Sequence, residues 1–224
     1  MEERKGLIED RERQQRSDNS DNPERLVKVL DFSADSDHEP DSNGEYTRAT
    51  LEAGPLPESF TVCSAFMVEA WTTVFRSADM FALLNDDGDR WGAINLFAGP
   101  SYTEYEVRVG PAFLVNQTGT MFFPLQWSRA CVSLDSAGSK MKVVVDGQLM
   151  GEEEYKREED EYRPTNISLM LGFAALSREE YTGRHSELNI FNSPLSVERM
   201  IGQTVAGGED YGAPGDLVNW EEAE

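Results

Sequence analysis

The residues best suited to binding a ligand form one acidic turn, in which Asp86, Asp87 and Asp89 precede Trp91. Carboxylates can bind calcium or sugar hydroxyl groups, and a tryptophan ring can stack on a sugar ring. A solvated hairpin tip and core packing of the tryptophan would explain the same residues. We therefore treat these four as candidate ligand-binding residues. We expect no metal site, because calcium takes six to eight oxygens and this turn alone offers too few.

Catalytic groups follow no recognisable pattern. Residues 152–161 (EEEYKREEDE) carry many carboxylates, which glycoside hydrolysis uses in pairs, but their unbroken run is typical of a charged surface loop. His38 and His185 are far apart, and no G-x-S-x-G motif supplies a nucleophile. We therefore predict that the protein is not an enzyme and has no catalytic residues.

Cysteine usage and two sequons favour an extracellular origin. Cys63 and Cys131 each lie inside an apolar segment, and their spacing from the histidines fits no zinc motif. Asn116 and Asn166 begin Asn-x-Thr and Asn-x-Ser triplets, acceptor patterns that also occur by chance. We predict a secreted glycoprotein. Residues 1–16 contain no apolar block of signal-peptide type, so we expect the chain to be an excised segment or an incomplete gene product.

The charge of the chain limits its partners. Forty-two acidic and 20 basic residues give a formal net charge of −22, which repels phosphate backbones and anionic headgroups. The sequence has no run of 18 apolar residues, so we expect no membrane insertion within the chain. We therefore expect neither nucleic acid nor membrane as a partner.

Short apolar segments separated by turn residues predict an all-β sandwich. One short helix is expected, with Ser196 as its N-cap, Glu198 in its first turn and its end at Gly202. The predicted strands are residues 26–32, 60–68, 80–84, 93–97, 105–109, 130–134, 141–145, 167–171 and 188–191.

The domain is predicted to occupy residues 26–220. Residues 1–25 have too few apolar side chains to pack on a core, so we predict a disordered charged tail or linker. Residues 221–224 form a second tail.

Eight short segments occur in a characteristic order along the chain. They are FTVC (60–63), RACVS (129–133), DSAG (135–138), VVVDG (143–147), TGR (182–184), LNIFN (188–192), PLS (194–196) and GDLVNW (215–220). This order resembles the pentraxins, within the concanavalin A-like lectin and laminin G group. The resemblance implies a two-sheet antiparallel jelly roll, a closing strand at 215–220 and a disulfide between Cys63 and Cys131.

Two departures from the pentraxin pattern affect the expected chemistry. Arg129 and Leu134 stand where the family has a histidine and a tryptophan. Ala174, Ala175 and Leu176 stand where the family has a Glu-Gln-Asp cluster that binds two calcium ions, and these side chains supply no oxygen ligands. We therefore expect folding without a cofactor and without the usual calcium pair, with one weak calcium site as the alternative.

The resemblance implies an extracellular, non-catalytic recognition module that binds a glycan or a protein epitope. The alternative is a structural or assembly domain of a longer extracellular receptor or adhesion protein. Pentraxins assemble into rings, so the resemblance is also compatible with a homo-oligomer.

Overall fold

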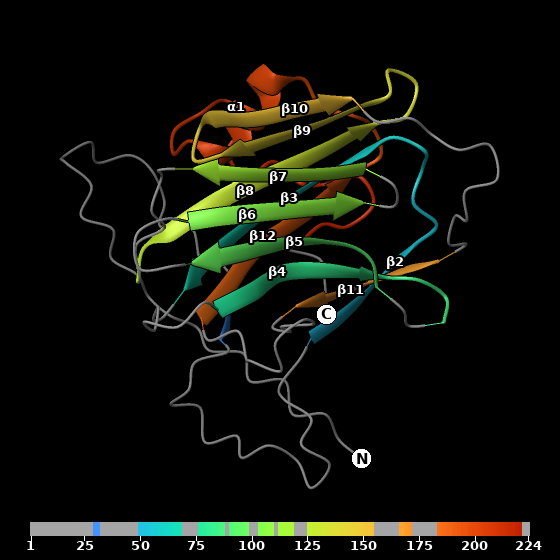
Figure 1. Ribbon diagram of the computed structural model, residues 1–224, viewed down its shortest axis with the longest axis horizontal. Helices are drawn as coiled ribbons and strands as arrows, with labels where there is room; N and C mark the ends of the chain where they lie inside the picture. The colour runs from blue at the N-terminus through green and yellow to red at the C-terminus, as the bar shows by residue number, and fades with distance from the viewer. Residues whose placement is uncertain are drawn as a thin grey trace, which may run out of the picture.

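Two antiparallel sheets, each with six strands in the described part of the chain, pack face to face (Figure 1). The computed structural model describes residues 29–31, 49–68, 76–87, 90–98, 103–109, 112–118, 125–154, 166–171 and 183–220. The predicted all-β sandwich is therefore confirmed.

Sheet A has the strand order β1-β12-β3-β8-β9-β10, in which every neighbouring pair is antiparallel. β8, β9 and β10 follow one another as hairpins, whereas β3 lies between strands that are distant in the sequence. The strands are β1 (Val29–Asp31), β12 (Gly183–Phe191), β3 (Phe60–Val68), β8 (Trp127–Asp135), β9 (Lys140–Val145) and β10 (Gln148–Glu154).

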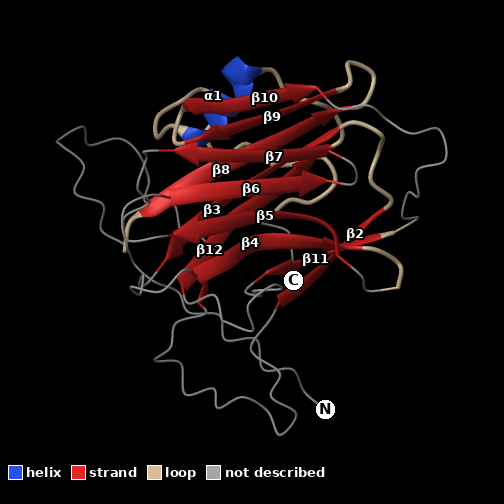
Figure 2. Ribbon diagram, viewed as in Figure 1, coloured by secondary structure: helices blue, strands red, loops and turns tan. Residues whose placement is uncertain are grey.

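Sheet B has the order β2-β11-β4-β5-β6-β7 and is also antiparallel throughout. β4 to β7 form a continuous meander, and in Figure 2 they lie in front of sheet A. The strands are β2 (Ala49–Gly54), β11 (Ile167–Leu171), β4 (Arg76–Leu84), β5 (Arg90–Ala98), β6 (Thr103–Val109) and β7 (Ala112–Thr118).

The main core lies between the sheets and takes alternate residues from the strands. β3 contributes Phe60, Val62 and Phe66, which share one face because successive strand residues lie on opposite faces. The other buried members are Leu83, Ala130, Val132, Leu134, Met141, Val143, Val145, Ile167, Leu169, Leu171, Leu188, Ile190, Val218 and Trp220.

A second apolar cluster lies on the opposite face of sheet A, beneath helix α1 (Val197–Thr204). In Figure 2 this helix lies at one side of the sandwich, beside β9 and β10. The cluster consists of Cys63, Cys131, Val144, Phe191, Leu195 and Met200. The predicted disulfide is confirmed: Cys63 and Cys131 are directly opposed on β3 and β8, and their Cα atoms are 4.1 Å apart.

The predicted N-cap of the helix is confirmed, but the helix is longer than expected. The Ser196 hydroxyl accepts a hydrogen bond from the Arg199 backbone N–H at 3.3 Å. The helix passes through Gly202 to Thr204, two residues beyond the expected end. A glycine favours a helix end by adopting a left-handed conformation, and the first glycine after α1 that does so is Gly207, with φ of 83°.

The segment after α1 packs beside β12, but the closing strand predicted at 215–220 is wrong. Val218 makes a single isolated β-bridge to Ile190 and is not part of a strand. The Asn189 side-chain oxygen accepts hydrogen bonds from the backbone N–H groups of Gly215 and Trp220, each at 3.2 Å. The Ile190 backbone N–H also donates to the Val218 carbonyl at 3.0 Å, and the Leu217 N–H donates to the Ile190 carbonyl at 2.9 Å. These bonds hold the segment beside β12 without a regular ladder, and Val218 and Trp220 are buried in the main core.

Three strands were not predicted, namely β2, β7 and β10. The prediction of a charged loop at 152–161 is wrong for its first three residues. Glu152 to Glu154 belong to β10 and pair with Lys142 to Lys140 of β9. All three strands lie at a sheet edge in the described topology. An edge strand needs a ladder on one side only, so β10 can carry three consecutive glutamates with little apolar patterning.

Candidate functional site

The acidic turn between β4 and β5 is attached to the start of β11. One Asp86 carboxylate oxygen, Oδ1, accepts hydrogen bonds from the Asn166 backbone N–H at 2.9 Å and from its side-chain Nδ2 at 3.2 Å. The Asp87 backbone N–H donates to Asn85 Oδ1 at 3.1 Å, which closes the turn. The structure thus brings together a predicted ligand residue and a predicted glycan acceptor. Asp89 lies outside the described residues.

The remaining predicted ligand residue, Trp91, is half-buried and packs against the main core. Its ring therefore stabilises the sandwich, and a role in ligand stacking stays a prediction. Asp87 is exposed and can contact solutes directly.

The expected loss of the pentraxin calcium pair stays a prediction. Within them, no three His, Cys, Asp or Glu side chains are grouped closely enough to hold a metal ion. Asp86, which sequence reasoning placed in the ligand set, holds Asn166 with one of its carboxylate oxygens. Ala174, Ala175 and Leu176 lie outside the described residues.

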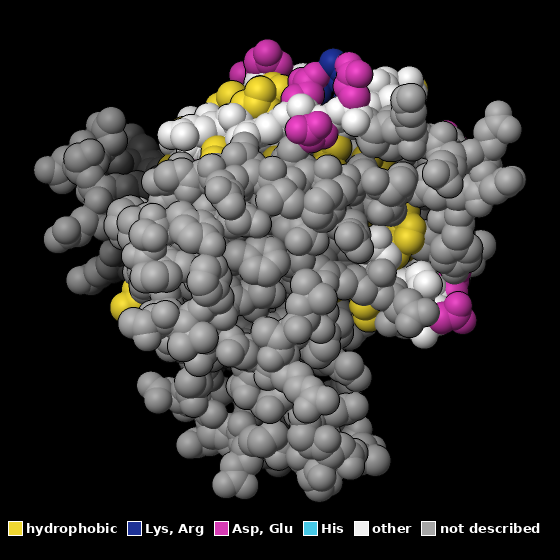
Figure 3. Space-filling view, viewed as in Figure 1, with side chains coloured by type: hydrophobic (Ala, Val, Ile, Leu, Met, Phe, Trp, Pro, Cys, Tyr) yellow, Lys and Arg dark blue, Asp and Glu magenta, His cyan; other side chains and the backbone are white. Residues whose placement is uncertain are grey.

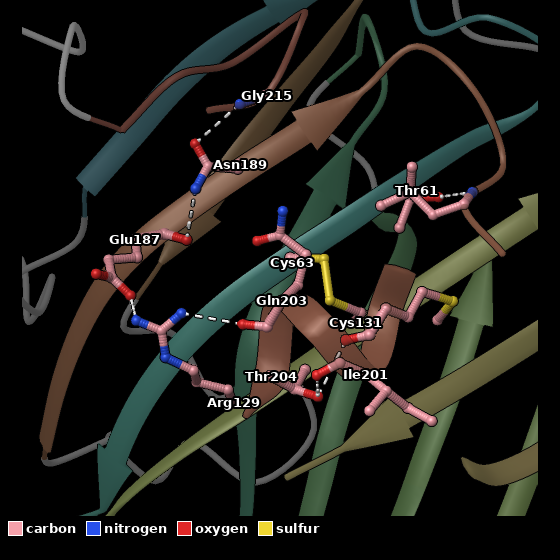
Figure 4. The surroundings of a disulfide bond; sticks show 12 residues. Thr61, Cys63, Arg129, Cys131, Glu187, Asn189, Ile201, Gln203, Thr204 and Gly215 are labelled. Atoms are coloured by element: carbon pink, nitrogen blue, oxygen red, sulfur yellow. Dashed lines mark hydrogen bonds and ion pairs between the residues drawn. A yellow bond between two sulfur atoms is a disulfide. The ribbon is translucent and has the colours of Figure 1, made fainter. Parts of the chain in front are cut away.

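The most developed polar arrangement is an ion pair between Arg129 and Glu187 on the outer face of sheet A, close to the disulfide (Figure 4). The two side chains are 14% and 8% exposed. Their strands, β8 and β12, are not neighbours, because β3 lies between them. Arg129 pairs with Ala65 of β3, and Ala65 pairs with Ser186. The small alanine leaves room for the guanidinium to cross β3 and reach Glu187.

Arg129 also connects the sheet to the helix and to the loop that follows it. Its guanidinium donates a hydrogen bond to the Gln203 carbonyl at 3.2 Å and lies 3.7 Å from the centre of the Tyr211 ring. The Arg129 backbone N–H donates to Asp146 Oδ1 at 2.7 Å in the β9–β10 turn. Arg129 is therefore a structural hub, and these contacts give it no open position for a ligand.

Sequence reasoning missed this hub, although it contained a usable signal. From the sequence, Arg129 is only a departure from the pentraxin pattern. Arg129 and Glu187 are the charged residues of otherwise apolar or small-residue stretches, RACV and SELNIF. Charged side chains in buried strands are almost always paired. One acidic and one basic residue in two such strands therefore predict an ion pair between them.

His185 is a second ionisable residue in β12, and it is fully buried. Removal from water lowers the pKa of its imidazole to about 3, because burial penalises the charged form. It is therefore neutral in the folded protein at physiological pH and serves as a structural residue.

This burial predicts a loss of stability on acidification. Between pH 6.5 and about 3 the unfolded chain binds a proton at His185 that the native state does not bind, so stability falls as pH falls. Between pH 7.5 and pH 5, we expect wild type to lose about 2 kcal/mol more unfolding free energy than His185→Phe. Urea unfolding at both pH values measures the difference. His38→Gln, which removes the other histidine, should behave as wild type, and equal losses in wild type and His185→Phe would contradict this assignment.

The structure has the same fold as several solved structures. A native heptameric SAP-like pentraxin from Limulus polyphemus superposes with a TM-score of 0.69 at 14% identity, over 88% of this chain and 89% of that chain. Domain 4 of the arabinanase AbnA from Geobacillus stearothermophilus, in complex with arabinotriose, gives 0.52 at 15% identity, over 80% and 76%. The extracellular region of zebrafish Gpr126 gives 0.53 at 11%, over 77% of this chain and 24% of that chain.

Comparison of the sequence with family profiles gives a match over most of the chain. The profile of the concanavalin A-like lectin/glucanases superfamily matches residues 43–200. Among curated protein sequences, none matches this chain significantly. In the described part of the chain, the single helix has eight residues, too few to cross a lipid bilayer.

Proposed function

Because this chain belongs to the concanavalin A-like lectin/glucanases superfamily, we propose that it is an extracellular, non-catalytic recognition module for a glycan or protein epitope. The observation that carries the proposal is the pentraxin fold, shared over 88% of the chain. The disulfide supports an extracellular location, because such bonds persist in oxidising compartments. The module comprises residues 26–220, and the segments on either side are tails.

The proposed binding surface is the β4–β5 turn, with Asp87, Asp89 and Trp91 as ligand residues and Asp86 holding the turn to β11. Helix α1 covers part of the outer face of sheet A, whereas the β4–β5 turn connects two neighbouring strands of sheet B (Figure 1). The exposed Asp87 can accept hydrogen bonds from sugar hydroxyls or pair with a basic group.

The charge of the protein narrows the class of ligand. The net charge is −22, and exposed acidic side chains gather at the end of the molecule formed by α1 and β10 (Figure 3), among them Glu152, Glu153 and Glu154. A field of this sign raises the local concentration of cations and lowers that of anions. Neutral glycans and basic protein surfaces are therefore the favoured ligands.

A glycan array tests the proposal directly. Purified wild type should bind a defined subset of sugars, and Asp87→Asn should bind them more weakly because it loses the carboxylate. Glu153→Gln is the matched control, since it removes one exposed acid from the distant edge strand β10 and should bind as wild type. Equal binding by both variants would show that the turn is not the binding surface.

The alternative function is a structural or assembly domain of a longer extracellular receptor or adhesion protein. The likeness to part of the Gpr126 extracellular region favours this candidate. A silent array combined with a concentration-dependent oligomer in light scattering would support assembly. Sugar binding by a monomer would support recognition.

Calcium should not stabilise the protein. A ligand that binds only the native state at about 1,000 times its Kd raises stability by about 4 kcal/mol. Since the described residues group no three potential metal-binding side chains, we expect nearly the same melting temperature in millimolar calcium and in excess chelator. A calcium-dependent rise of several degrees would show that other residues supply a site.

A further inference from the structure

The two sequons of the chain occupy different structural positions. Asn166 is exposed and immediately precedes β11, and its neighbour Ile167 is 1% exposed and belongs to the main core. Asn166 is thus a surface residue whose position is fixed by the buried strand that follows it. We propose that Asn166 carries an N-linked glycan in the folded protein and that Asn116 does not. The inference rests on the proposed passage through the secretory pathway.

The contact with Asp86 is compatible with this modification. The Asn166 carboxamide has two N–H hydrogens, and Asp86 Oδ1 lies 3.2 Å from the nitrogen. In the transfer, Nδ2 bonds to the anomeric carbon of a lipid-diphosphate-linked oligosaccharide. The bond from that carbon to the diphosphate oxygen breaks, the lipid diphosphate leaves with the electron pair, and in the net reaction it takes up the one proton that the amide loses. The second N–H remains and can still donate to Asp86.

A second hydrogen bond fixes the same residue without involving the atom that is modified. The Asn166 backbone N–H donates to Asp86 Oδ1 at 2.9 Å. The attachment point of the glycan is therefore held by two bonds to one carboxylate. A bulky, hydrophilic glycan can extend into solvent from this position without disturbing the core.

Asn116 lies within a strand that is paired along its whole length. It pairs with Tyr105, and Tyr105 pairs with Leu96, so these three residues form one row across β7, β6 and β5. Acceptor asparagines are typical of surface loops, whereas Asn116 occupies an interior position of a regular, paired strand. The strand context of Asn116 is therefore unfavourable for a glycan.

The test is to secrete the chain from eukaryotic cells behind an added signal peptide and to map glycan occupancy by mass spectrometry, with and without peptide N-glycosidase. Wild type and Asn116→Gln should carry one glycan each, at Asn166. Asn166→Gln should carry none. Ser168→Ala should also carry none, because it retains the Asn166 side chain but removes the hydroxyl residue that the sequon requires.

An unmodified Asn166 in the secreted wild type, or a glycan at Asn116, overturns the inference. Protein retained in the cells is mapped in the same way, so a failure of secretion is also informative: retained wild type without a glycan at Asn166 overturns it too. The added signal peptide makes the result independent of the natural location. Sugar binding by wild type produced without glycosylation is measured separately, so the recognition proposal can fail while this inference stands.

Discussion

Replacing both cysteines, as Cys63→Ala/Cys131→Ala, should lower the free energy of unfolding by about 4 kcal/mol. The disulfide closes a loop between residues separated by 68 positions, and the chain-entropy model assigns about that stabilisation to a loop of this length. The bond lies beneath α1, where Cys63 is 5% exposed and Cys131 is fully buried. Urea unfolding followed by fluorescence measures the loss.

The control for this prediction is wild-type protein that has been reduced and refolded under reducing conditions. It retains both sulfur atoms, so it separates the cross-link from the packing of the side chains in the cluster with Leu195 and Met200. Reduced wild type should lose nearly as much stability as the double variant. Retention of full stability by both would show that the bond does not constrain the unfolded chain.

Removing the positive charge of the buried ion pair should have an effect of similar size. In Arg129→Met, Glu187 remains buried without its cation, and breaking a buried pair on one side costs about 3 to 5 kcal/mol. The variant also loses the hydrogen bond to the Gln203 carbonyl and the contact with Tyr211. We expect a large drop in the urea midpoint of unfolding, with α1 and its following loop losing protection from hydrogen exchange first.

A double-variant cycle isolates the charge effect. Arg129→Met/Glu187→Gln leaves no unpaired charge and should recover part of the lost stability, because a buried ion pair replaced on both sides can be nearly neutral. Lys140→Met is the matched control, since it removes the cation of the solvent-exposed pair between Lys140 and Glu152 in the same sheet. That variant should unfold almost as wild type. Additive effects of the two buried substitutions would contradict a direct coupling.

Regular strands in the middle of the sheets could be predicted from sequence because burial on at least one face imposes an apolar pattern. β3 and β11 were predicted with their observed bounds, as were the central residues of β8, most of β9 and the last four residues of β12. The edge strand β10 escaped prediction because it has one ladder and its side chains are largely exposed, so its sequence needs no such pattern. β7 is also an edge strand in the described topology.

The closing strand shows a limit of the family resemblance. The GDLVNW segment correctly indicated that Val218 and Trp220 belong to the core, since apolar side chains carry that information. It could not indicate that Asn189 binds the backbone of Gly215 and Trp220, or that the segment makes an isolated bridge to β12 instead of a ladder. That contact joins residues that are distant in the sequence.

The sequence by itself determined the fold class, the disulfide and the helix N-cap, because each depends on local patterning or on a pair of residues that the family resemblance identifies. Tertiary structure alone decided which polar residues meet. Asp86 binds Asn166 because β4 and β11 are neighbours in sheet B, and Arg129 reaches Glu187 because Ala65 stands between them on β3. Such partners are set by strand order, and strand order in an antiparallel sandwich depends on contacts between segments that are distant in the sequence, as between Val29 of β1 and Ser186 of β12.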